Sequence, residues 1–324
     1  MSITVSDFGK GTHLYKITDG DYSIEVTDFG ATLVSIFAPD KNGTVENVVL
    51  GYKDVTGYQT HSGHIGATVG RNANRIANAN VTINGVTYPL TVNDNDRNNL
   101  HSGLNYYDQR IWETLPIVEE ENRVIFYLKS PHMDQGFPGN AGIWVAYSLT
   151  SDHEVCIKYN VVCDKDTIVN MTNHSYFNLT GNPNKTIFDH KVWVNADYYT
   201  PLDEFQIPTG KLQSVEGTLM DFRNERPVAN EYDHNWVLKN KRKCELVATC
   251  KDEASGRIME VYTDLPGMQI YTGNGLKDPF IPHSAICFES QYFPDSIHHE
   301  NFKSPILKAN QMYESVTKYR FRAA

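Results

Sequence analysis

The chain of 324 residues lacks the long apolar runs and glycine patterns that mark several large protein classes. No stretch approaches the roughly 20 apolar residues that a membrane-spanning helix needs. We find no Gly-x-Gly-x-x-Gly after a strand and no Gly-x-x-x-x-Gly-Lys-Ser/Thr, so nucleotide-phosphate binding is unsupported. Gly-x-Ser-x-Gly is also missing, so the sequence does not indicate the nucleophile elbow of an esterase.

Cysteine is scarce, and the five cysteines show no paired spacing. Cys156 and Cys163 fall in strand-like runs and Cys287 in an apolar one, as buried free thiols often do. This usage indicates a reducing compartment. The N-terminus, Met-Ser-Ile-Thr-Val-Ser-Asp, has neither the basic nor the apolar region of a secretory signal. We therefore predict a cytoplasmic protein.

Positive charge is in short supply. The formal net charge is −10, which argues against nucleic acid and anionic membrane surfaces as partners. The basic run at residues 239–243 is short, and we interpret it as a solvated turn.

Apolar residues rarely recur at helical spacing over eleven or more positions. Short alternating or apolar runs broken by turn residues dominate instead, and Asn84-Gly85 has the composition of a type I′ hairpin turn. Brief helical turns are expected at residues 54–58 and 227–232. Many short strands at close spacing predict an all-β fold, a large antiparallel β-sandwich with a few short helices. No linker, repeat or low-complexity tract is visible, so we predict a single domain over residues 1–324.

Polar side chains are dense at residues 170–181, Asn-Met-Thr-Asn-His-Ser-Tyr-Phe-Asn-Leu-Thr-Gly, which we place in a loop after a strand-like run. His174 is its one group able to move a proton near neutral pH. The many amides and hydroxyls around it suit a ligand rich in hydroxyl groups. The structural alternative is a polar loop that satisfies its own backbone.

Histidine pairs could suggest a metal site. His61-Ser-Gly-His64 has no Glu at zincin spacing, and no cysteine pair accompanies it or His298-His299. We therefore expect no metal.

Glu289 is the most informative carboxylate because it ends an apolar strand and lies next to aromatic residues. A carboxylate in such a poorly solvated place usually has a partner or a function. A structural pairing with an arginine or a backbone amide is an equal alternative.

Four other residues are weaker candidates. His101 lies in a turn, Asp233 is flanked by aromatic residues, and Gln269 lies in an apolar run where a buried amide needs partners. Arg75 has few acidic neighbours, and Asp233 is a possible structural partner for it. Each residue on its own favours a structural role.

Taken together, the motifs resemble those of the aldose 1-epimerase (galactose mutarotase) family, in the family's order and across nearly the whole chain. The matching segments are Asp28-Phe29-Gly30-Ala31, Val49-Leu50-Gly51, Gly70-Arg71-Asn72-Ala73-Asn74-Arg75-Ile76, Asn99-Leu100-His101-Ser102-Gly103, Thr172-Asn173-His174-Ser175-Tyr176-Phe177-Asn178-Leu179, Ile207-Pro208-Thr209-Gly210, Tyr232-Asp233-His234-Asn235 and Phe288-Glu289-Ser290-Gln291. Two positions depart from the family pattern. Ser102 replaces a usual Gly, and Ala309-Asn310-Gln311 replaces a usual Pro-Gly-Glu.

The resemblance implies a β-super-sandwich that holds a free hexopyranose such as galactose or glucose on its concave face and interconverts its α and β anomers without cofactor or metal. It implies that Glu289 is the base and His174 the acid. The expected sugar-binding residues are Asn74, Arg75, His101, Tyr176, Asp233 and Gln269. Monomer and homodimer both remain open.

Three alternatives remain at this stage. A non-catalytic carbohydrate-binding sandwich would need the aromatic and amide groups but no matched acid and base. A glycoside hydrolase would need two carboxylates across a scissile bond. A hexose-6-phosphate epimerase would need additional Arg or Lys near the site for the phosphate.

Overall fold

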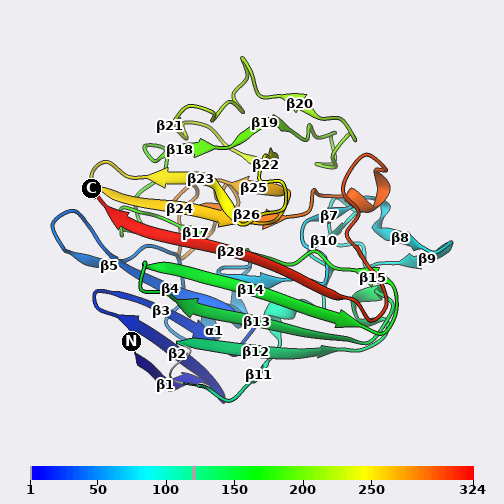
Figure 1. The fold of residues 1–324 in the computed structure, drawn as a ribbon, viewed down its shortest axis with the longest axis horizontal. Coiled ribbons are helices and arrows are strands. Elements are labelled where there is room, and N and C mark those ends of the chain that lie inside the picture. The colour runs from blue at the N-terminus through cyan, green and yellow to red at the C-terminus, as the bar shows by residue number, and fades with distance from the viewer. Residues whose placement is uncertain (1, 119–121) are drawn as a thin grey trace.

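A nine-stranded sheet crosses the whole molecule in the computed structural model, which describes residues 2–118 and 122–324 (Figure 1). Its paired neighbours run antiparallel, with β28 at the centre. In spatial order the strands are β11 (Glu113–Thr114), β12 (Arg123–Ser130), β13 (Ala141–Leu149), β14 (Glu154–Cys163), β28 (Met312–Ala323), β24 (Arg257–Thr263), β23 (Glu245–Lys251), β18 (Lys191–Val194) and β21 (Arg226–Pro227).

Two further large sheets pack with it. One comprises β1 (Ser2–Gly9), β2 (Thr12–Asp19), β3 (Tyr22–Thr27), β4 (Thr32–Pro39) and β5 (Val45–Asn47). The other, in spatial order, comprises β17 (Tyr176–Phe177), β26 (Ile286–Gln291), β25 (Gly267–Tyr271), β22 (Asp233–Leu238), β19 (Ala196–Tyr199) and β20 (Gln213–Ser214).

Short strand pairs and single helical turns complete the described chain. The pairs are β7 (Arg75–Ile76) with β10 (Asn99–Leu100), β6 (Ala67–Val69) with β16 (Thr172–His174), β8 (Asn80–Ile83) with β9 (Val86–Pro89), and β15 (Thr167–Ile168) with β27 (Ile306–Leu307). The helices are α1 (Val55–Thr60) and the 3-10 turns η1 (Ala77–Ala79), η2 (Tyr107–Gln109), η4 (Asp134–Gly136) and η5 (Ser296–His298).

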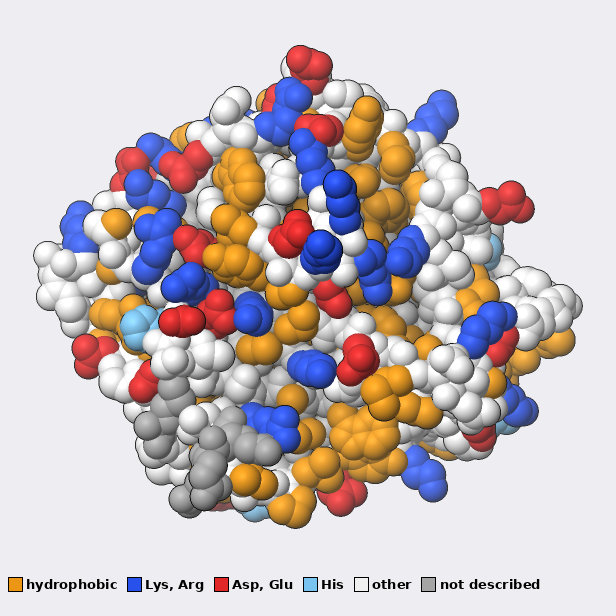
Figure 2. Space-filling model, viewed as in Figure 1, with side chains coloured by type: hydrophobic (Ala, Val, Ile, Leu, Met, Phe, Trp, Pro, Cys, Tyr) orange, Lys and Arg blue, Asp and Glu red, His pale blue; other side chains and the backbone are white. Residues whose placement is uncertain are grey.

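The core is built from strands in which every second side chain is buried. Buried and partly exposed residues alternate along the whole of β13, because successive side chains of a strand point to opposite faces of the sheet. The inward side chains of the three large sheets share one apolar cluster, to which Ile24, Val145 and Phe288 each belong. The outer face of the nine-stranded sheet carries charged side chains scattered among apolar ones (Figure 2), including the pair of Lys318 with Glu154 at 2.9 Å.

β26 is buried on both faces. Its side chains point alternately toward the core and toward the site. Ile286 and Phe288 belong to the core cluster. The intervening positions, Cys287 and Glu289, therefore face the opposite side. In the neighbouring strand β25, Gln269 lies opposite Glu289 and Tyr271 lies opposite Cys287.

The all-β prediction is confirmed, and the predicted Asn84-Gly85 turn joins β8 to β9 with both residues at positive φ. The helical turn expected at residues 54–58 corresponds to α1. The one expected at residues 227–232 is wrong. There, Val228 and Ala229 donate their N–H groups to His190 and Phe188, beside β18, instead of forming helical bonds.

The placement of residues 170–181 in a loop is also wrong, because this stretch contains the strands β16 and β17 and its residues 170–179 are buried. Several of its polar side chains do bind backbone, as the structural alternative held. The Asn178 amide, for example, donates to the carbonyl groups of Asn182, Lys185 and Ser284.

The structure confirms most of two smaller predictions, the buried free thiols and the solvated basic turn, with one exception in each. Cys156 is only partly buried, whereas Cys163 and Cys287 are buried, and all three are free thiols. Residues 239–243 form a turn, but Asn240 is buried within it. Within residues 2–118 and 122–324, no helix is long and apolar enough to cross a membrane.

Arg71 is fully buried and links segments far apart in the chain. Its guanidinium donates to the Pro138 carbonyl at 2.9 Å, to Thr167 Oγ1 at 3.0 Å and to Ser130 Oγ at 2.7 Å.

We expect Arg71→Met to lower the free energy of unfolding by about 3–5 kcal/mol, because buried acceptors would lose a charged donor. Chemical denaturation measures the change. Arg223→Met, at the surface pair with Asp221, is the control and should unfold near the parent midpoint; equal losses in the two variants would refute the assignment.

Ser102 has a φ of 69°, a backbone conformation that favours glycine. Its hydroxyl nevertheless forms two hydrogen bonds. Oγ accepts from the Asn72 N–H at 2.8 Å and donates to the Asn72 carbonyl at 2.9 Å. Ser102→Ala should cost about 2 kcal/mol through two lost buried hydrogen bonds. Ser102→Gly should cost up to about 1 kcal/mol less, because glycine adopts positive φ freely. Melting temperatures should therefore fall in the order parent, Ser102→Gly, Ser102→Ala, and a glycine variant as stable as the parent would contradict this account.

Candidate functional site

A cavity of about 190 Å³ opens between the six-stranded sheet and the segments that carry β7, β10 and β16. Its walls combine imidazole, carboxylate, guanidinium and aromatic groups. The lining residues are Gly63, His64, Asn74, Arg75, Leu100, His101, His174, Tyr176, Asp233, Tyr271 and Glu289. The structure thus places seven of the eight residues expected from the sequence around one cavity.

The eighth, Gln269, lies behind the wall. Its Nε2 donates to Asp233 Oδ1 at 2.7 Å, and its Oε1 is buried without a partner among the described residues. Gln269 therefore helps to hold Asp233, which stands in β22 at the rim of the cavity.

Glu289 and His174 face each other at the floor of the cavity. His174 Nε2 lies 3.7 Å from Glu289 Oε1, and both side chains are less than 10% exposed. Glu289 Oε2 is buried and finds no partner within the described part of the chain. A buried carboxylate oxygen without a partner is costly, so this atom is placed to accept a hydrogen bond from a ligand.

Two neighbours set the orientation of the His174 ring. It stacks on Tyr176, with ring centroids 4.9 Å apart, and Nδ1 lies 3.5 Å from the Cys287 thiol. The Tyr176 hydroxyl donates to the Gly63 carbonyl at 2.8 Å. Tyr176 thus presents its ring to the cavity, and Nε2 of His174 is the nitrogen directed at Glu289.

Burial shifts both members of the pair toward their neutral forms. It raises the pKa of Glu289 well above 4.5, and the charge of Asp233 adds to this while Arg75 opposes it. Burial, assisted by the charge of His64, lowers the pKa of His174 to about 3. In the empty site both shifts favour a protonated carboxyl group on Glu289 and a neutral imidazole on His174.

His101 is prepared to donate to a ligand. Its Nδ1 accepts the backbone N–H of Asn74 at 3.1 Å, so in the neutral ring Nε2 carries the hydrogen. Burial lowers the pKa of His101 well below 6.5, and the charges of His64, His174 and Arg75 lower it further. The ring therefore remains neutral at physiological pH.

Arg75 is held rigidly at the opposite wall. Its guanidinium contacts Asp94 at 3.2 Å, Gln206 at 2.5 Å and Asp233 at 3.6 Å. The structural pairing with Asp233 considered from the sequence thus exists, and both residues still line the cavity.

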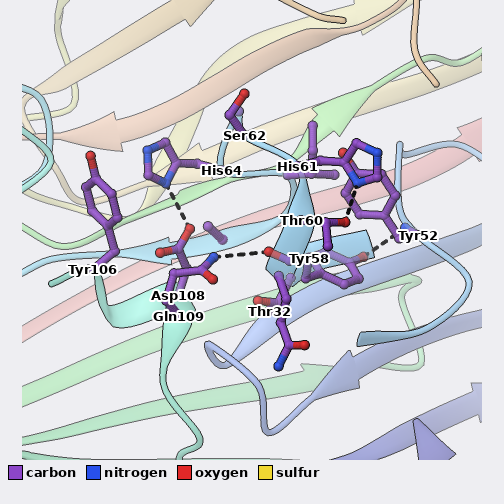
Figure 3. A pocket seen from close by; sticks show the side chains of 14 residues that line it. Thr32, Tyr52, Tyr58, Thr60, His61, Ser62, His64, Tyr106, Asp108 and Gln109 are labelled. Atoms are coloured by element: carbon purple, nitrogen blue, oxygen red, sulfur yellow. Dashed lines mark hydrogen bonds and ion pairs between the residues drawn. The ribbon is translucent and has the colours of Figure 1, made fainter. Parts of the chain in front are cut away.

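Four lining residues were not among the expected site residues: Gly63, His64, Leu100 and Tyr271. Tyr271 lies opposite Asp233 in the sheet register, which alternation in the 268–272 run could have indicated. His64 was considered only for a metal. In the structure His64 lies on the loop that leads into β6. Its Nδ1 lies 2.8 Å from Asp108 Oδ2 (Figure 3).

The His64 ring completes a cluster of three imidazoles, with centroids 5.0 Å from His101 and 6.2 Å from His174. Burial works against its charge, but the Asp108 carboxylate outweighs burial and raises the pKa of His64 above 6.5. The other pair considered for a metal, His298 and His299, contacts Asp295.

Comparisons with known proteins identify the family of the chain. The family model described as aldose 1-epimerase matches residues 13–320. The chain is 36% identical to a galactose mutarotase of Mus musculus over the full length of both proteins. It is 37% identical to an aldose 1-epimerase of Escherichia coli, covering 93% of this chain and 92% of the relative.

Among solved structures, the aldose epimerase homologue from C. elegans superposes with a TM-score of 0.91 at 27% identity and covers 97% of this chain and 100% of its own. The match spans the strands that carry the cavity as well as the outer sheets. The chain therefore belongs to the aldose 1-epimerase family, and its activity is that of an aldose 1-epimerase, an isomerase acting on sugars.

Proposed function

We propose that Glu289 and His174 together move the protons that open and close the pyranose ring of a free hexopyranose such as galactose or glucose. One observation carries the proposal: a buried carboxylate and a buried imidazole lie 3.7 Å apart at the floor of a cavity, and one carboxylate oxygen has no hydrogen-bond partner among residues 2–118 and 122–324. Anomer exchange needs an acid and a base acting on one acetal carbon, and this pair supplies both.

The pair starts with one shared proton, which is on Glu289 in the empty site. When a sugar binds, its C1 hydroxyl donates to Glu289, which favours the carboxylate form and moves the proton to His174 Nε2. Glu289 then takes the C1 hydroxyl proton while His174 protonates the ring oxygen, and the ring opens. After rotation about the C1–C2 bond, the reverse transfers close the ring as the other anomer.

The remaining wall binds the sugar hydroxyls. Asp233 can accept from two neighbouring hydroxyls, with Gln269 behind it. Arg75 and the Asn74 side chain serve the hydroxyls farther from C1. His101 donates from Nε2 beside the ring oxygen, and Tyr176 forms the wall behind His174.

A phosphorylated hexose fits this cavity less well. Arg75 is the one Lys or Arg side chain in the described lining, and Asp94, Gln206 and Asp233 already occupy it. Phosphate recognition usually employs several cations. The lining therefore favours the free sugar over the hexose 6-phosphate.

We also propose that residues 1–324 act as one domain in the cytoplasm. The shared apolar cluster of the three large sheets supports the single domain. The five free cysteines support a reducing compartment, and the net charge of −10 disfavours nucleic acid and anionic membranes as partners.

Glu289→Gln tests the base. The amide keeps the shape and can still bind the C1 hydroxyl, but it cannot take the proton. We expect kcat to fall by at least about 10²-fold, since general-base catalysis contributes about 10²–10⁴-fold, while KM moves far less. His174→Asn should lose as much, and the double variant should lose little more than either one, because both groups serve one coupled event.

The measurement is the initial mutarotation rate above the spontaneous background, with sugar affinity from calorimetry. Glu113→Gln, at an exposed position in β11, is the matched control and should behave as the parent. If Glu289→Gln stays within about threefold of the parent, far short of a general base's contribution, another group is the base.

Asp233→Asn tests the electrostatics of the pair. The reactive form holds one proton, which is lost on the alkaline side as pH rises through the raised pKa of Glu289. Because the charge of Asp233 helps to raise that pKa, its removal should move the alkaline limb of the kcat/KM profile to lower pH. The limb belongs to the coupled pair and not to one residue. A limb that stays in place, or moves to higher pH, would contradict the assignment.

A further inference from the structure

Gln206 is an exposed residue whose side chain reaches a buried side chain of the site. It does not line the cavity, yet its Oε1 accepts a hydrogen bond from Arg75 Nη2 at 2.5 Å. Arg75 itself is only 8% exposed. An exposed amide can bond to water equally well, so this contact adds little to the stability of the fold. Its effect falls instead on the position of the Arg75 guanidinium.

The turn at residues 203–207 fixes the direction of the Gln206 side chain. Gln206 has a φ of 62°, a conformation that residues other than glycine rarely adopt. Asp203 holds the turn in this shape, because its Oδ1 accepts the N–H groups of Phe205 and Ile207, both at 2.9 Å. The backbone N–H of Gln206 also donates to the Asp203 carbonyl, at 3.1 Å.

This turn is docked on the segment that supplies the other side-chain acceptor of the guanidinium, Asp94. Asn95 Nδ2 donates to the Phe205 carbonyl at 3.2 Å. The Arg97 guanidinium lies over the Phe205 ring, 4.3 Å from its centroid. The amide acceptor and the carboxylate acceptor of Arg75 therefore belong to two segments that are fixed to each other.

The two bonds leave a defined set of donors free. A guanidinium carries five N–H groups. In Arg75, Nε uses one on Asp94 and Nη2 uses one on Gln206. Nη1 lies 3.6 Å from Asp233 Oδ2, which is too long for a hydrogen bond, and it has no other acceptor among residues 2–118 and 122–324. Both hydrogens of Nη1 thus remain for a ligand in the cavity that Arg75 and Asp233 line.

Loss of the Gln206 acceptor would release one side of this arrangement. The guanidinium would then be held at Nε alone and could turn toward Asp233, only 3.6 Å away. Arginine and carboxylate groups that can approach freely prefer a direct, two-pronged pairing. Such a pairing would occupy the Nη1 donors and the carboxylate oxygens together, and both are needed by sugar hydroxyls.

We propose that Gln206 is a positioning residue for the sugar: it holds the Arg75 guanidinium apart from Asp233, so that both groups stay available to the sugar hydroxyls. This rests on the proposed binding of the sugar by Arg75 and Asp233. Gln206 takes no part in proton transfer at C1 or at the ring oxygen. Its contribution therefore belongs to sugar binding and not to the chemical step.

Gln206→Leu removes the acceptor and keeps a side chain of similar size. We expect KM for galactose and glucose to rise about three- to tenfold, as loss of one hydrogen bond's worth of binding would give. The value of kcat should stay within twofold of the parent, because the acid and the base are untouched. Initial mutarotation rates above the spontaneous background give both constants, and calorimetry gives sugar affinity independently of turnover.

Two further substitutions at the same position separate positioning from a structural role. Gln206→Gly relieves the positive φ, so it should melt no lower than Gln206→Leu, yet its KM should rise as much. Gln206→Glu keeps an oxygen acceptor for the guanidinium and should restore KM to within twofold of the parent. Glu204→Gln, at an exposed position in the same turn, is the matched control and should behave as the parent.

Arg75→Met distinguishes failure of this proposal from failure of the sugar contacts beneath it. If Arg75 binds the sugar, its loss raises KM, and adding Gln206→Leu should raise KM no further, because the two residues act through one guanidinium. An unchanged KM in Arg75→Met would overturn the sugar contact itself, and the role of Gln206 with it.

The other outcomes bear on Gln206 alone. A parent-like KM in Gln206→Leu or Gln206→Gly, a loss confined to kcat, a Gln206→Glu variant as weak as Gln206→Leu, or additive effects in the double variant would each overturn the positioning role while Arg75→Met still raised KM.

Discussion

Burial of Glu289 is the constraint on which the site depends. The carboxylate stands in β26, a strand buried on both faces, and it is 2% exposed. An ionised carboxylate is strongly disfavoured in such a place, so its pKa rises and it holds a proton that it will release to a suitable acceptor. The same burial depresses the pKa of His174. Two groups that would differ by about two units in water thus exchange their order, so in the empty site the proton is favoured on the carboxyl group.

Two surrounding residues act in opposite directions on the pKa of Glu289. Asp233 raises and Arg75 lowers the pKa of Glu289, while Asp233 and Arg75 also contact each other at 3.6 Å. A sugar that hydrogen-bonds to both would change the field at the carboxylate as it binds. On the proposed mechanism, sugar binding would therefore be coupled to the position of the proton through two side chains that do not themselves transfer it.

The sequence predicted most of this arrangement, and the exceptions have physical reasons. Many strands are visible as short alternating or apolar runs, and the apolar run before Glu289 correctly indicated a poorly solvated carboxyl group. The loop assigned at residues 170–181 failed because its polarity suggested exposure, whereas its amides serve buried backbone groups such as the Ser284 carbonyl. The helical turn at residues 227–232 failed because the carbonyl groups of Phe188 and His190, just before β18 and distant in the chain, accept the N–H groups of Ala229 and Val228. Local pattern does not show such partners.

The role of His64 could not be predicted from the sequence, because it depends on a contact between residues far apart in the chain. Its significance depends on Asp108, which lies 44 positions away and contacts it at 2.8 Å. The carboxylate makes His64 the imidazole of the cluster that favours the charged form. That charge in turn disfavours protonation of His101 and His174, because like charges at these separations repel. Asp108 therefore influences His174 through an intermediate ring, because it favours the charged form of His64, and that charge helps to keep His101 and His174 in their neutral forms.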